Sequence, residues 1–338
     1  MKEWLLYSPA SQVNEATRYY LRTISKAGET LGRELRHVQS LGDVPAEADV
    51  LVVECKSAYK LRVARPSARC WLWMQGIVPE EARLQFGSRW REALWTFFER
   101  SALARALGVI MVSQAMRTHY LRKYGFEHVP SFVMPCVNSE LNSASIFTPE
   151  KYLRPSFVYA GSLHTWQCFD LTLAVFALVK AKCPMATLTV LTGDQEAARR
   201  AILDAKLNDV EVNFVPLEAL QARLAFYKYG FVLRRPHVVN AVATPTKVSS
   251  YMAAGVIPIM STAIEDYAVA MLNVRPIVMC DELRPEAIAD AILKLETQVV
   301  KAEDVLRSYS TIFESYFNHA GYASGLRQFL SGTGLRPG

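Results

Sequence analysis

The chain has 338 residues, of which 51% are hydrophobic and 21% charged, and its formal net charge at pH 7 is +6. At about 150 residues per domain this length indicates two domains, and the apolar content excludes a disordered chain. The mild positive excess does not indicate nucleic acid as a partner, since nucleic-acid-binding proteins usually carry a concentrated basic stripe.

No segment has the pattern of a secretory signal or a membrane span. The longest near-continuous apolar stretch, residues 171–179, is far shorter than the roughly 20 residues that a span requires. The six cysteines are scattered without a Cys-x-x-Cys pair, which is typical of reduced thiols rather than of disulfides or a zinc cluster. We therefore expect a cytoplasmic protein.

Short apolar runs alternate with helical stretches in the first half of the chain, which predicts parallel α/β architecture. Residues 50–53 are apolar in succession, as in a strand that helices cover on both faces. The predicted strands are residues 4–8, 36–41, 49–54, 70–75, 108–113 and 131–135, and the predicted helices are residues 13–27, 57–63, 80–107 and 114–124.

The pattern lapses at residues 138–155, where Asn, Ser and Pro gather, and this composition predicts a linker. A second alternating series follows. Its predicted strands are residues 157–160, 186–191, 210–215, 231–233, 256–260 and 276–279, and its predicted helices are residues 169–182, 195–205, 217–227, 246–254, 265–272, 285–296, 302–316 and 319–330.

The predicted fold is α/β, with two Rossmann-like domains whose parallel sheets face an interdomain cleft. The N-terminal domain covers residues 1–150 and the C-terminal domain residues 151–318, and the helix and tail at 319–338 are expected to pack back toward the N-terminal domain. Ligands of such sheets bind beyond the carboxyl ends of the strands. Each domain can therefore hold one substrate, although the fold alone does not define a reaction.

Two strands of the second half end in glycine turns. Residues 157–160 lead into Gly161 and Ser162, where the backbone can approach a ligand and the amides of the following helix can receive a phosphate. An ordinary strand-to-helix turn explains the same residues equally well. The next strand ends at Gly193, and Asp194 is expected to cap the helix after it.

The most specific segment follows the strand at residues 231–233. That strand ends at Arg234, and a polar loop with His237 and Asn240 comes next. Lys247 lies in the first turn of the following helix, where a cation opposes the helix dipole unless an anion is near. Arg234, Lys247 and the free amides of this helix start are therefore predicted to converge on one diphosphate. The alternative is a solvated basic loop before a capped helix.

The run Pro245-Thr-Lys-x-x-x-Tyr-Met-Ala-Ala-Gly-Val-x-Pro258, after a strand ending in Leu-Arg and a loop with Asn, resembles the donor-site signature of family-4 glycosyltransferases of the GT-B fold. Tyr-Ala-Gly-Ser-Leu at residues 159–163 is similar to the first strand and loop of that family's C-terminal domain. Residues 73–81 and 112–116 resemble a bacterial polysaccharide-type subgroup.

This resemblance implies a hexosyltransferase that moves a sugar from a nucleoside-diphosphate sugar, with retention of configuration, to a saccharide or lipid-linked saccharide. The pathway would be bacterial surface polysaccharide (capsule) synthesis. Arg234 and Lys247 would act catalytically by neutralising the leaving diphosphate. The resemblance and the turn chemistry together give as nucleotide-sugar-binding candidates Gly161, Ser162, Gly193, His237, Asn240, Thr246 and Ser250.

The acceptor would bind the N-terminal domain. Candidates are Asn14, Glu15, Arg18, Gln75, Glu80 and Glu81. Glu15 and Arg18 are spaced to pair on one helix face, and Glu80 and Glu81 open a helix, where negative charge is favoured in any case. Both pairs therefore also have a purely structural explanation.

The sequence departs from the family pattern where many members carry two glutamates eight positions apart. Val242 and Ser250 occupy those places. No Asp-x-Asp motif occurs, so we expect a site without metal and without a cofactor other than the sugar nucleotide. The absence of Gly-x-x-x-x-Gly-Lys and Gly-x-Gly-x-x-Gly argues against a P-loop NTPase and a dehydrogenase.

Two alternatives stay open. One is a nucleotide-sugar epimerase of the same fold, for which His237 is the evident acid–base candidate. The other is a non-catalytic glycosyltransferase-like subunit, which the missing glutamates favour.

Residues 56–105 contain ten basic residues against four acidic ones, together with four of the six tryptophans, namely Trp71, Trp73, Trp90 and Trp95. Trp with Arg and Lys is the composition of a surface at a membrane interface. Buried tryptophans beside a solvated basic face are the alternative. If the surface exists, it predicts peripheral contact with an anionic membrane at the inner face of the cytoplasmic membrane.

Overall fold

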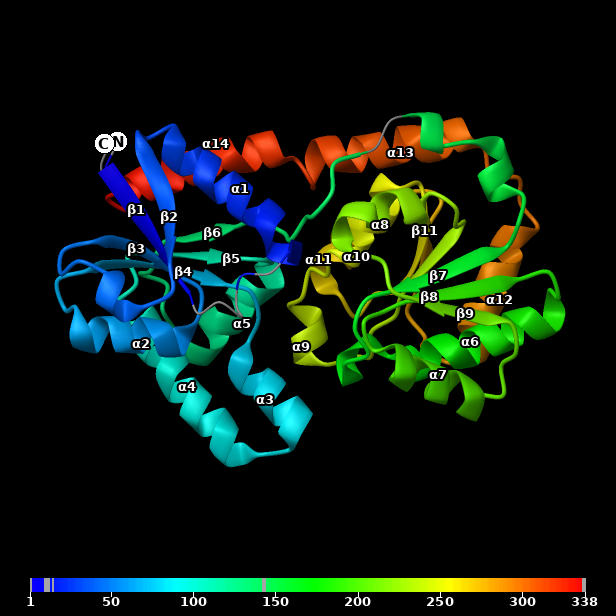
Figure 1. The fold of residues 1–338 in the computed structure, drawn as a ribbon, viewed down its shortest axis with the longest axis horizontal. Coiled ribbons are helices and arrows are strands. Elements are labelled where there is room, and N and C mark those ends of the chain that lie inside the picture. The colour runs from blue at the N-terminus through cyan, green and yellow to red at the C-terminus, as the bar shows by residue number, and fades with distance from the viewer. Residues whose placement is uncertain (1, 9–12, 14, 142–143, 336–338) are drawn as a thin grey trace. The chain divides into compact units, whose positions relative to one another are not determined.

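The computed structural model of the chain describes residues 2–8, 13, 15–141 and 144–335, which form two compact α/β units (Figure 1). The first unit comprises Met1–Cys136, Ala241–Thr244 and Asn318–Gly338, and the second comprises Val137–Asn240 and Pro245–Phe317. Residues 137–150, which we assigned to the N-terminal domain, group with the second unit instead.

Each unit contains a six-stranded parallel sheet, which confirms the predicted α/β class with two parallel-sheet domains. The first sheet has the order β2-β1-β3-β4-β5-β6. Every residue of β3 and β5 is buried, as their continuous apolar runs require. The strands are β1 (Lys2–Tyr7), β2 (Arg33–Val38), β3 (Asp49–Val52), β4 (Arg69–Met74), β5 (Gly108–Met111) and β6 (Ser131–Val133).

The helices of the first unit are α1 (Glu15–Glu29), α2 (Cys55–Ala64), α3 (Val78–Phe86), α4 (Arg89–Leu103), α5 (Gln114–Tyr124) and α14 (His319–Gly332), with a short 3-10 turn at Leu41–Asp43. The single helix predicted at residues 80–107 is wrong. Gly87 ends α3 in a left-handed conformation with φ +64°, and the Ser88 hydroxyl caps α4 by accepting from Arg91 N at 3.3 Å.

The last helix, α14, lies against α1 (Figure 1). Its Leu326 and Leu330 are buried in one apolar cluster with Trp4, Trp71 and Trp73. The last helix of the chain therefore completes the core of the first unit.

The second sheet has the order β12-β11-β10-β7-β8-β9. Its strands are β7 (Ser156–Ala160), β8 (Thr187–Leu191), β9 (Val210–Asn213), β10 (Tyr229–Val232), β11 (Ile257–Ser261) and β12 (Val278–Cys280). Its helices are α6 (Phe169–Lys182), α7 (Gln195–Asp204), α8 (Leu217–Leu224), α9 (Val238–Ala241), α10 (Lys247–Ala253), α11 (Glu265–Ala270), α12 (Pro285–Glu296) and α13 (Ala302–Ser315).

The segment at residues 138–155, predicted as a linker, is packed onto the second unit. It forms 3-10 turns at Ala144–Ile146 and Pro149–Tyr152. The Tyr152 hydroxyl donates to Gly255 O at 2.8 Å, and buried Lys151 donates to Ala254 O. Its polar side chains thus serve as hydrogen-bond partners for the end of α10, which a composition signal does not reveal.

All six cysteines are free thiols. Among the residues that the structure describes, no helix combines the length and the apolar character that a membrane crossing needs.

Candidate functional site

The loop after β7 is built around Gly161. Gly161 adopts φ +129°, and a Cβ at this position would lie 2.7 Å from Cε of Lys247. A residue without a side chain is therefore needed here for Lys247 to cross the end of β7. The sequence predicted close approach of a ligand at Gly161, whereas the structure gives the glycine a direct role in seating a candidate catalytic lysine.

Lys247, the first residue of α10, is largely enclosed. Its Nζ donates to Gln167 Oε1 at 2.7 Å and lies 4.2 Å from the ring centroid of Tyr159. Burial, followed by the nearby charge of Arg234, holds the pKa of Lys247 well below its ordinary value. A dipole and an aromatic face are weaker compensation for a buried cation than a carboxylate.

Arg234 lies just beyond β10 and is only 4% exposed. One guanidinium nitrogen donates to Trp166 O at 2.7 Å, and the backbone of Arg234 is fixed by Ser261, whose hydroxyl donates to Arg234 O at 2.7 Å. Nε is buried without a hydrogen-bond partner. Burial lowers the pKa of Arg234 to about 10.

Arg234 and Lys247 therefore lie close together: both bond to the 3-10 turn Thr165–Gln167, and the charge of Arg234 lowers the pKa of Lys247. Within the described part of the chain, neither forms an ion pair with a carboxylate. Two neighbouring cations, one buried and one half-buried, are costly without a counter-charge, and a bound anion removes that cost. The arrangement suits a ligand with more than one negative charge.

The loop between Arg234 and α10 is organised by its own polar groups. Asn240 is buried, and its Nδ2 donates to Arg235 O at 2.8 Å while its Oδ1 is buried without a partner. His237 is exposed, and its Nδ1 accepts from Val239 N at 3.2 Å. Arg235 pairs at the surface with Asp170 at 2.6 Å. His237 and Asn240 thus shape the loop beside the two cations.

Ser250 and Thr246 occupy different environments from each other. The Ser250 hydroxyl is buried and donates to Asn138 Oδ1 at 2.7 Å. Thr246 precedes α10 with helical φ and makes no side-chain capping bond. Because α10 has only seven residues, the side chains of Arg234 and Lys247 provide most of the positive charge here.

The loops after β7 and β8 are tied together by Asp194. It stands at the N-cap position of α7 but makes no side-chain capping bond, so the predicted capping role is wrong. Its carboxylate accepts from Leu163 N at 3.1 Å instead. Ser162 O accepts the Tyr159 hydroxyl at 2.5 Å. Gly193 is exposed, and no atom lies within 4 Å of the place its Cβ would take.

The first unit has a polar pocket of about 400 Å³ beyond the carboxyl ends of β3 and β4. Its lining includes Glu54, Gln75, Glu81 and Trp95. Burial above all raises the pKa of Glu81, whose Oε1 accepts from Ile77 N at 3.1 Å. Gln75 Nε2 is buried without a partner. Two of the predicted acceptor residues, Gln75 and Glu81, therefore share a pocket.

Glu80 belongs to a different group of side chains. It lies 2.7 Å from Lys123 Nζ and 3.2 Å from His119 Nε2. Burial acts to raise the pKa of Glu80, but the hydrogen bonds from His119 and Lys123 outweigh it and hold the pKa below its ordinary value. Lys123 also contacts buried Glu99 at 3.1 Å. Successive residues of a helix point about 100° apart, so Glu80 is directed away from the pocket that Glu81 lines. Its ion pair with Lys123 gives Glu80 a structural role.

Of the other acceptor candidates, Asn14 is outside the described residues. Glu15 is the first residue of α1, and Arg18 is exposed on the same helix.

Sequence reasoning missed Tyr159, Gln167 and Ser261, which hold the two cations in place. Tyr159 and Gln167 flank the Gly161 loop in sequence, but nothing in their spacing connects them to Lys247. Ser261 is the last residue of β11, the strand next to β10, and its closeness to Arg234 depends on the strand order.

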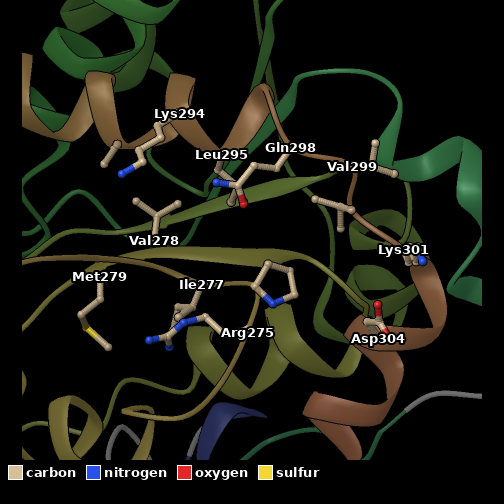
Figure 2. A pocket seen from close by; sticks show the side chains of 13 residues that line it. Arg275, Ile277, Val278, Met279, Lys294, Leu295, Gln298, Val299, Lys301 and Asp304 are labelled. Atoms are coloured by element: carbon tan, nitrogen blue, oxygen red, sulfur yellow. The ribbon is translucent and has the colours of Figure 1, made fainter.

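A further pocket, of about 440 Å³, lies beside the edge strand β12 of the second unit (Figure 2). Arg275, Lys294, Lys301 and Asp304 contribute to its lining together with apolar side chains (Figure 2). None of the predicted site residues lines it.

No known protein-family profile matches the sequence, and no curated protein matches it either. Similar solved structures exist. Sucrose-phosphate synthase from Thermosynechococcus elongatus has 13% identity and a TM-score of 0.73, covering 98% of this chain and 99% of that one. Anabaena HepE, solved with UDP and glucose, has 14% identity and a TM-score of 0.70, covering 98% and 99%. S. aureus TarM, solved as a mutant with fondaparinux, α-GlcNAc-glycerol and UDP, has 14% identity and a TM-score of 0.62, covering 84% and 56%.

The chain thus spans little more than half of the length of TarM and nearly all of the other two proteins. At these identities the likeness is one of fold. The chain has the two-domain α/β architecture of these GT-B glycosyltransferases.

Proposed function

We propose that the protein is a glycosyltransferase that uses a nucleoside-diphosphate sugar as donor and a saccharide or lipid-linked saccharide as acceptor. The observation that carries this proposal is the pair of neighbouring cations, buried Arg234 and half-buried Lys247, which have no carboxylate partner among the described residues. A fold likeness to glycosyltransferases, of which HepE was solved with UDP-glucose, supports the same conclusion.

The chemistry of the pair fits the departure of a nucleoside diphosphate. As the bond between the sugar and the diphosphate breaks, negative charge grows on the leaving oxygen, and fixed cations stabilise it more than they stabilise the intact donor. Arg234 offers a planar set of donors and Lys247 a compact charge. Loss of one such group typically slows a reaction about 10²- to 10³-fold.

The acceptor is assigned to the pocket of the first unit. Carboxylate and amide oxygens from Glu54, Gln75 and Glu81 are acceptors for sugar hydroxyls, and the Trp95 indole offers an apolar face. A pocket that combines a few directed polar groups with an aromatic wall suits a saccharide.

The finer parts of the proposal come from the sequence. They are transfer of a hexose with retention of configuration, independence of metal, and a role in bacterial surface polysaccharide synthesis at the inner face of the cytoplasmic membrane. Transfer that persists in EDTA would support metal independence, and the anomeric configuration of the product tests whether configuration is retained. Loss of transfer in EDTA that Mg²⁺ or Mn²⁺ restores would exclude the metal-independent site.

The central test is binding and transfer by Lys247→Ala. A thermal-shift screen against nucleoside diphosphates and their sugars identifies the donor, since a ligand that binds the native state raises the melting temperature. Lys247→Ala is expected to lose the shift and to lose transfer. Arg235→Ala is the matched control, because Arg235 neighbours the pair in sequence but forms a surface ion pair with Asp170.

Product analysis separates the alternatives. An epimerised free nucleotide sugar, formed without acceptor, would show that the protein is an epimerase and not a transferase. Nucleotide binding without turnover on any donor would indicate a non-catalytic subunit. Unchanged binding and transfer in Lys247→Ala would remove the basis of the proposal.

A further inference from the structure

Among the described residues of the first unit, the large hydrophobic side chains that remain exposed are confined to α2, α3 and α4. Trp90 is 72% exposed, Val63 66%, Phe97 55%, Phe86 53% and Leu94 37%. Single exposed apolar residues are ordinary, but a cluster of this kind marks an interaction surface. Two of the tryptophans that the sequence grouped with it, Trp71 and Trp73, are fully buried in the core instead.

The cluster has a regular geometry. Helices α3 and α4 form a hairpin (Figure 1), and Trp90, Leu94 and Phe97 recur along α4 at the spacing of one helix face. Phe86, the last residue of α3, lies beside this face, with the Arg91 guanidinium 4.2 Å from its ring centroid. We name Val63, Phe86, Trp90, Leu94 and Phe97 the hairpin face.

Helix α2 supports the hairpin face from one side. The Tyr59 ring contacts Phe97 at 5.5 Å between centroids, and Arg62 donates to Ser101 at 3.0 Å. The Phe97 ring is thus held in place by packing against α2.

The charges around the hairpin face have one sign. Exposed basic residues lie on both α2 and α4: Lys56, Lys60, Arg89, Arg91 and Arg100. The acidic residues of the same segment are turned inward or paired: Glu99 is buried, Glu80 contacts Lys123, and Glu92 pairs with Arg83 at 3.2 Å. These five exposed basic residues of α2 and α4 therefore give the surface around the hairpin face a positive excess, with Glu92 neutralised by Arg83.

From this combination we propose that the hairpin face docks on a membrane surface containing anionic phospholipids. Trp and Phe favour the boundary between headgroups and acyl chains, and basic residues around them are attracted to a negative leaflet. We commit to the bilayer because its anionic leaflet complements the basic residues and its headgroup boundary accommodates the exposed Trp90 ring.

Part of the hairpin face lies on the same helix as one wall of the acceptor pocket. Trp95 lines that pocket, while the adjacent Leu94 belongs to the hairpin face, so α4 borders both. A saccharide whose lipid stays in the bilayer can reach the pocket from the docked hairpin. This second step rests on the proposed function, whereas docking itself does not.

The test is sedimentation of the full chain with vesicles in the absence of donor. We expect binding to phosphatidylcholine vesicles that contain phosphatidylglycerol, little binding to phosphatidylcholine alone, and a decrease as salt rises. Trp90→Ser should weaken the affinity about tenfold, because one large ring no longer partitions. Lys56→Glu with Lys60→Glu should weaken it at least as much.

Matched controls lie on the second unit. Phe226→Ser changes a ring that is 71% exposed, and Lys294→Glu with Lys301→Glu reverses two exposed charges. They should bind vesicles like the unchanged protein, and all variants should keep its thermal unfolding. Equal losses in the controls, equal binding to neutral vesicles, or no vesicle binding at all would overturn the proposal. A dimer in sedimentation velocity that Trp90→Ser dissociates, without vesicle binding, would assign the face to a second copy of the chain.

Because no donor is present, this experiment is independent of glycosyl transfer. Vesicle binding with no nucleotide binding would preserve the docking surface and remove the proposed function. Transfer from a nucleotide sugar without vesicle binding would preserve the proposed function and remove the docking surface.

Discussion

Two lysines, one in each unit, differ in whether the surrounding protein supplies a counter-charge. Lys123 lies between Glu80 and Glu99, at 2.7 and 3.1 Å. Lys247 contacts an amide oxygen and an aromatic ring, with Arg234 as its nearest charged influence. The first cation is neutralised by the fold itself. The second has no carboxylate partner among the described residues, as the proposed diphosphate site requires.

The comparison separates structural from functional charge. A paired, buried ion holds elements together, and removing one partner leaves the other unsatisfied. A buried cation without a counter-charge opposes folding, and one reason to retain it is a bound anion. What distinguishes Lys247 from an isolated buried lysine is a second cation, Arg234, at the same place.

The largest expected effect comes from Lys247→Met, which removes the charge but keeps much of the side-chain volume. Transfer should fall about 10²- to 10³-fold because the leaving diphosphate loses a fixed cation. The free energy of unfolding without ligand should stay the same or rise by about 1 kcal/mol, since the native state no longer encloses an amine that lacks a counter-charge. Urea unfolding and an initial-rate assay measure the two. Lower stability with unchanged transfer would make Lys247 structural.

The opposite response is expected at Glu99. Glu99 is buried and accepts hydrogen bonds from Tyr120 at 2.9 Å, Tyr124 at 2.6 Å and Lys123 at 3.1 Å. Glu99→Ala should lower the free energy of unfolding by about 3 kcal/mol, because Lys123 and two hydroxyls lose their acceptor. Nucleoside diphosphate affinity should not change.

Glu99→Gln is the companion variant, since it keeps one acceptor oxygen and should lose less stability. If Glu99→Ala unfolded at the same urea concentration as the unchanged protein but no longer transferred sugar, Glu99 would have a functional rather than a structural role.

A pH dependence follows from a third buried lysine. Burial lowers the pKa of Lys151 to about 7, and its Nζ donates to Ala254 O. Between this pKa and the ordinary value of 10.5, the unfolded chain holds a proton that the native chain has released. Stability therefore rises with pH in this window, by at most about 1.4 kcal/mol per pH unit for one group.

Urea unfolding of the unchanged protein and of Lys151→Met, between about pH 7 and pH 9, measures this slope. The variant should show a shallower rise, by about 2 kcal/mol over the range. Lys247 has the same direction of pKa shift, so Lys247→Met should also flatten the curve. Identical slopes in all three proteins would mean that neither lysine is neutral in the native state.

The architecture could be predicted from the sequence because it depends on local periodicity. Alternating apolar runs and helical stretches gave two parallel sheets, and the convergence of Arg234 and Lys247 followed from a strand end and the next helix start. The partners of these residues could not be predicted. Gln167 and Lys247 are 80 positions apart, and only strand order brings them together.

Two errors have local causes. The merged helix at residues 80–107 overlooked Gly87 and Ser88, which are a left-handed helix end and an N-cap in direct succession. The segment predicted as a linker is polar because its side chains form hydrogen bonds with α10. Asn138 accepts from Ser250, and Lys151 donates to Ala254 O at the end of the helix. Composition records that a segment is polar but not where its polar groups are directed.

The smallest and most discriminating effects concern two glycines, Gly161 and Gly193, in the loops after β7 and β8. Gly161→Ala places a Cβ 2.7 Å from Cε of Lys247 at a backbone φ of +129°, so it should cost about 1–2 kcal/mol of stability and displace the lysine. Nucleoside diphosphate affinity should fall about tenfold. At Gly193 nothing lies within 4 Å and no left-handed φ is needed, so Gly193→Ala should change the free energy of unfolding by less than about 0.5 kcal/mol.

Calorimetric titration of both variants then tests the predicted role of Gly193 itself. If the diphosphate lies against its backbone, Gly193→Ala loses affinity while keeping its stability, because the added methyl group meets only the ligand. If affinity is unchanged, the donor is held from the side of Gly161, Arg234 and Lys247, and the glycine after β8 serves only as a turn. A stability loss at Gly193 equal to that at Gly161 would contradict the difference in backbone geometry from which both expectations are derived.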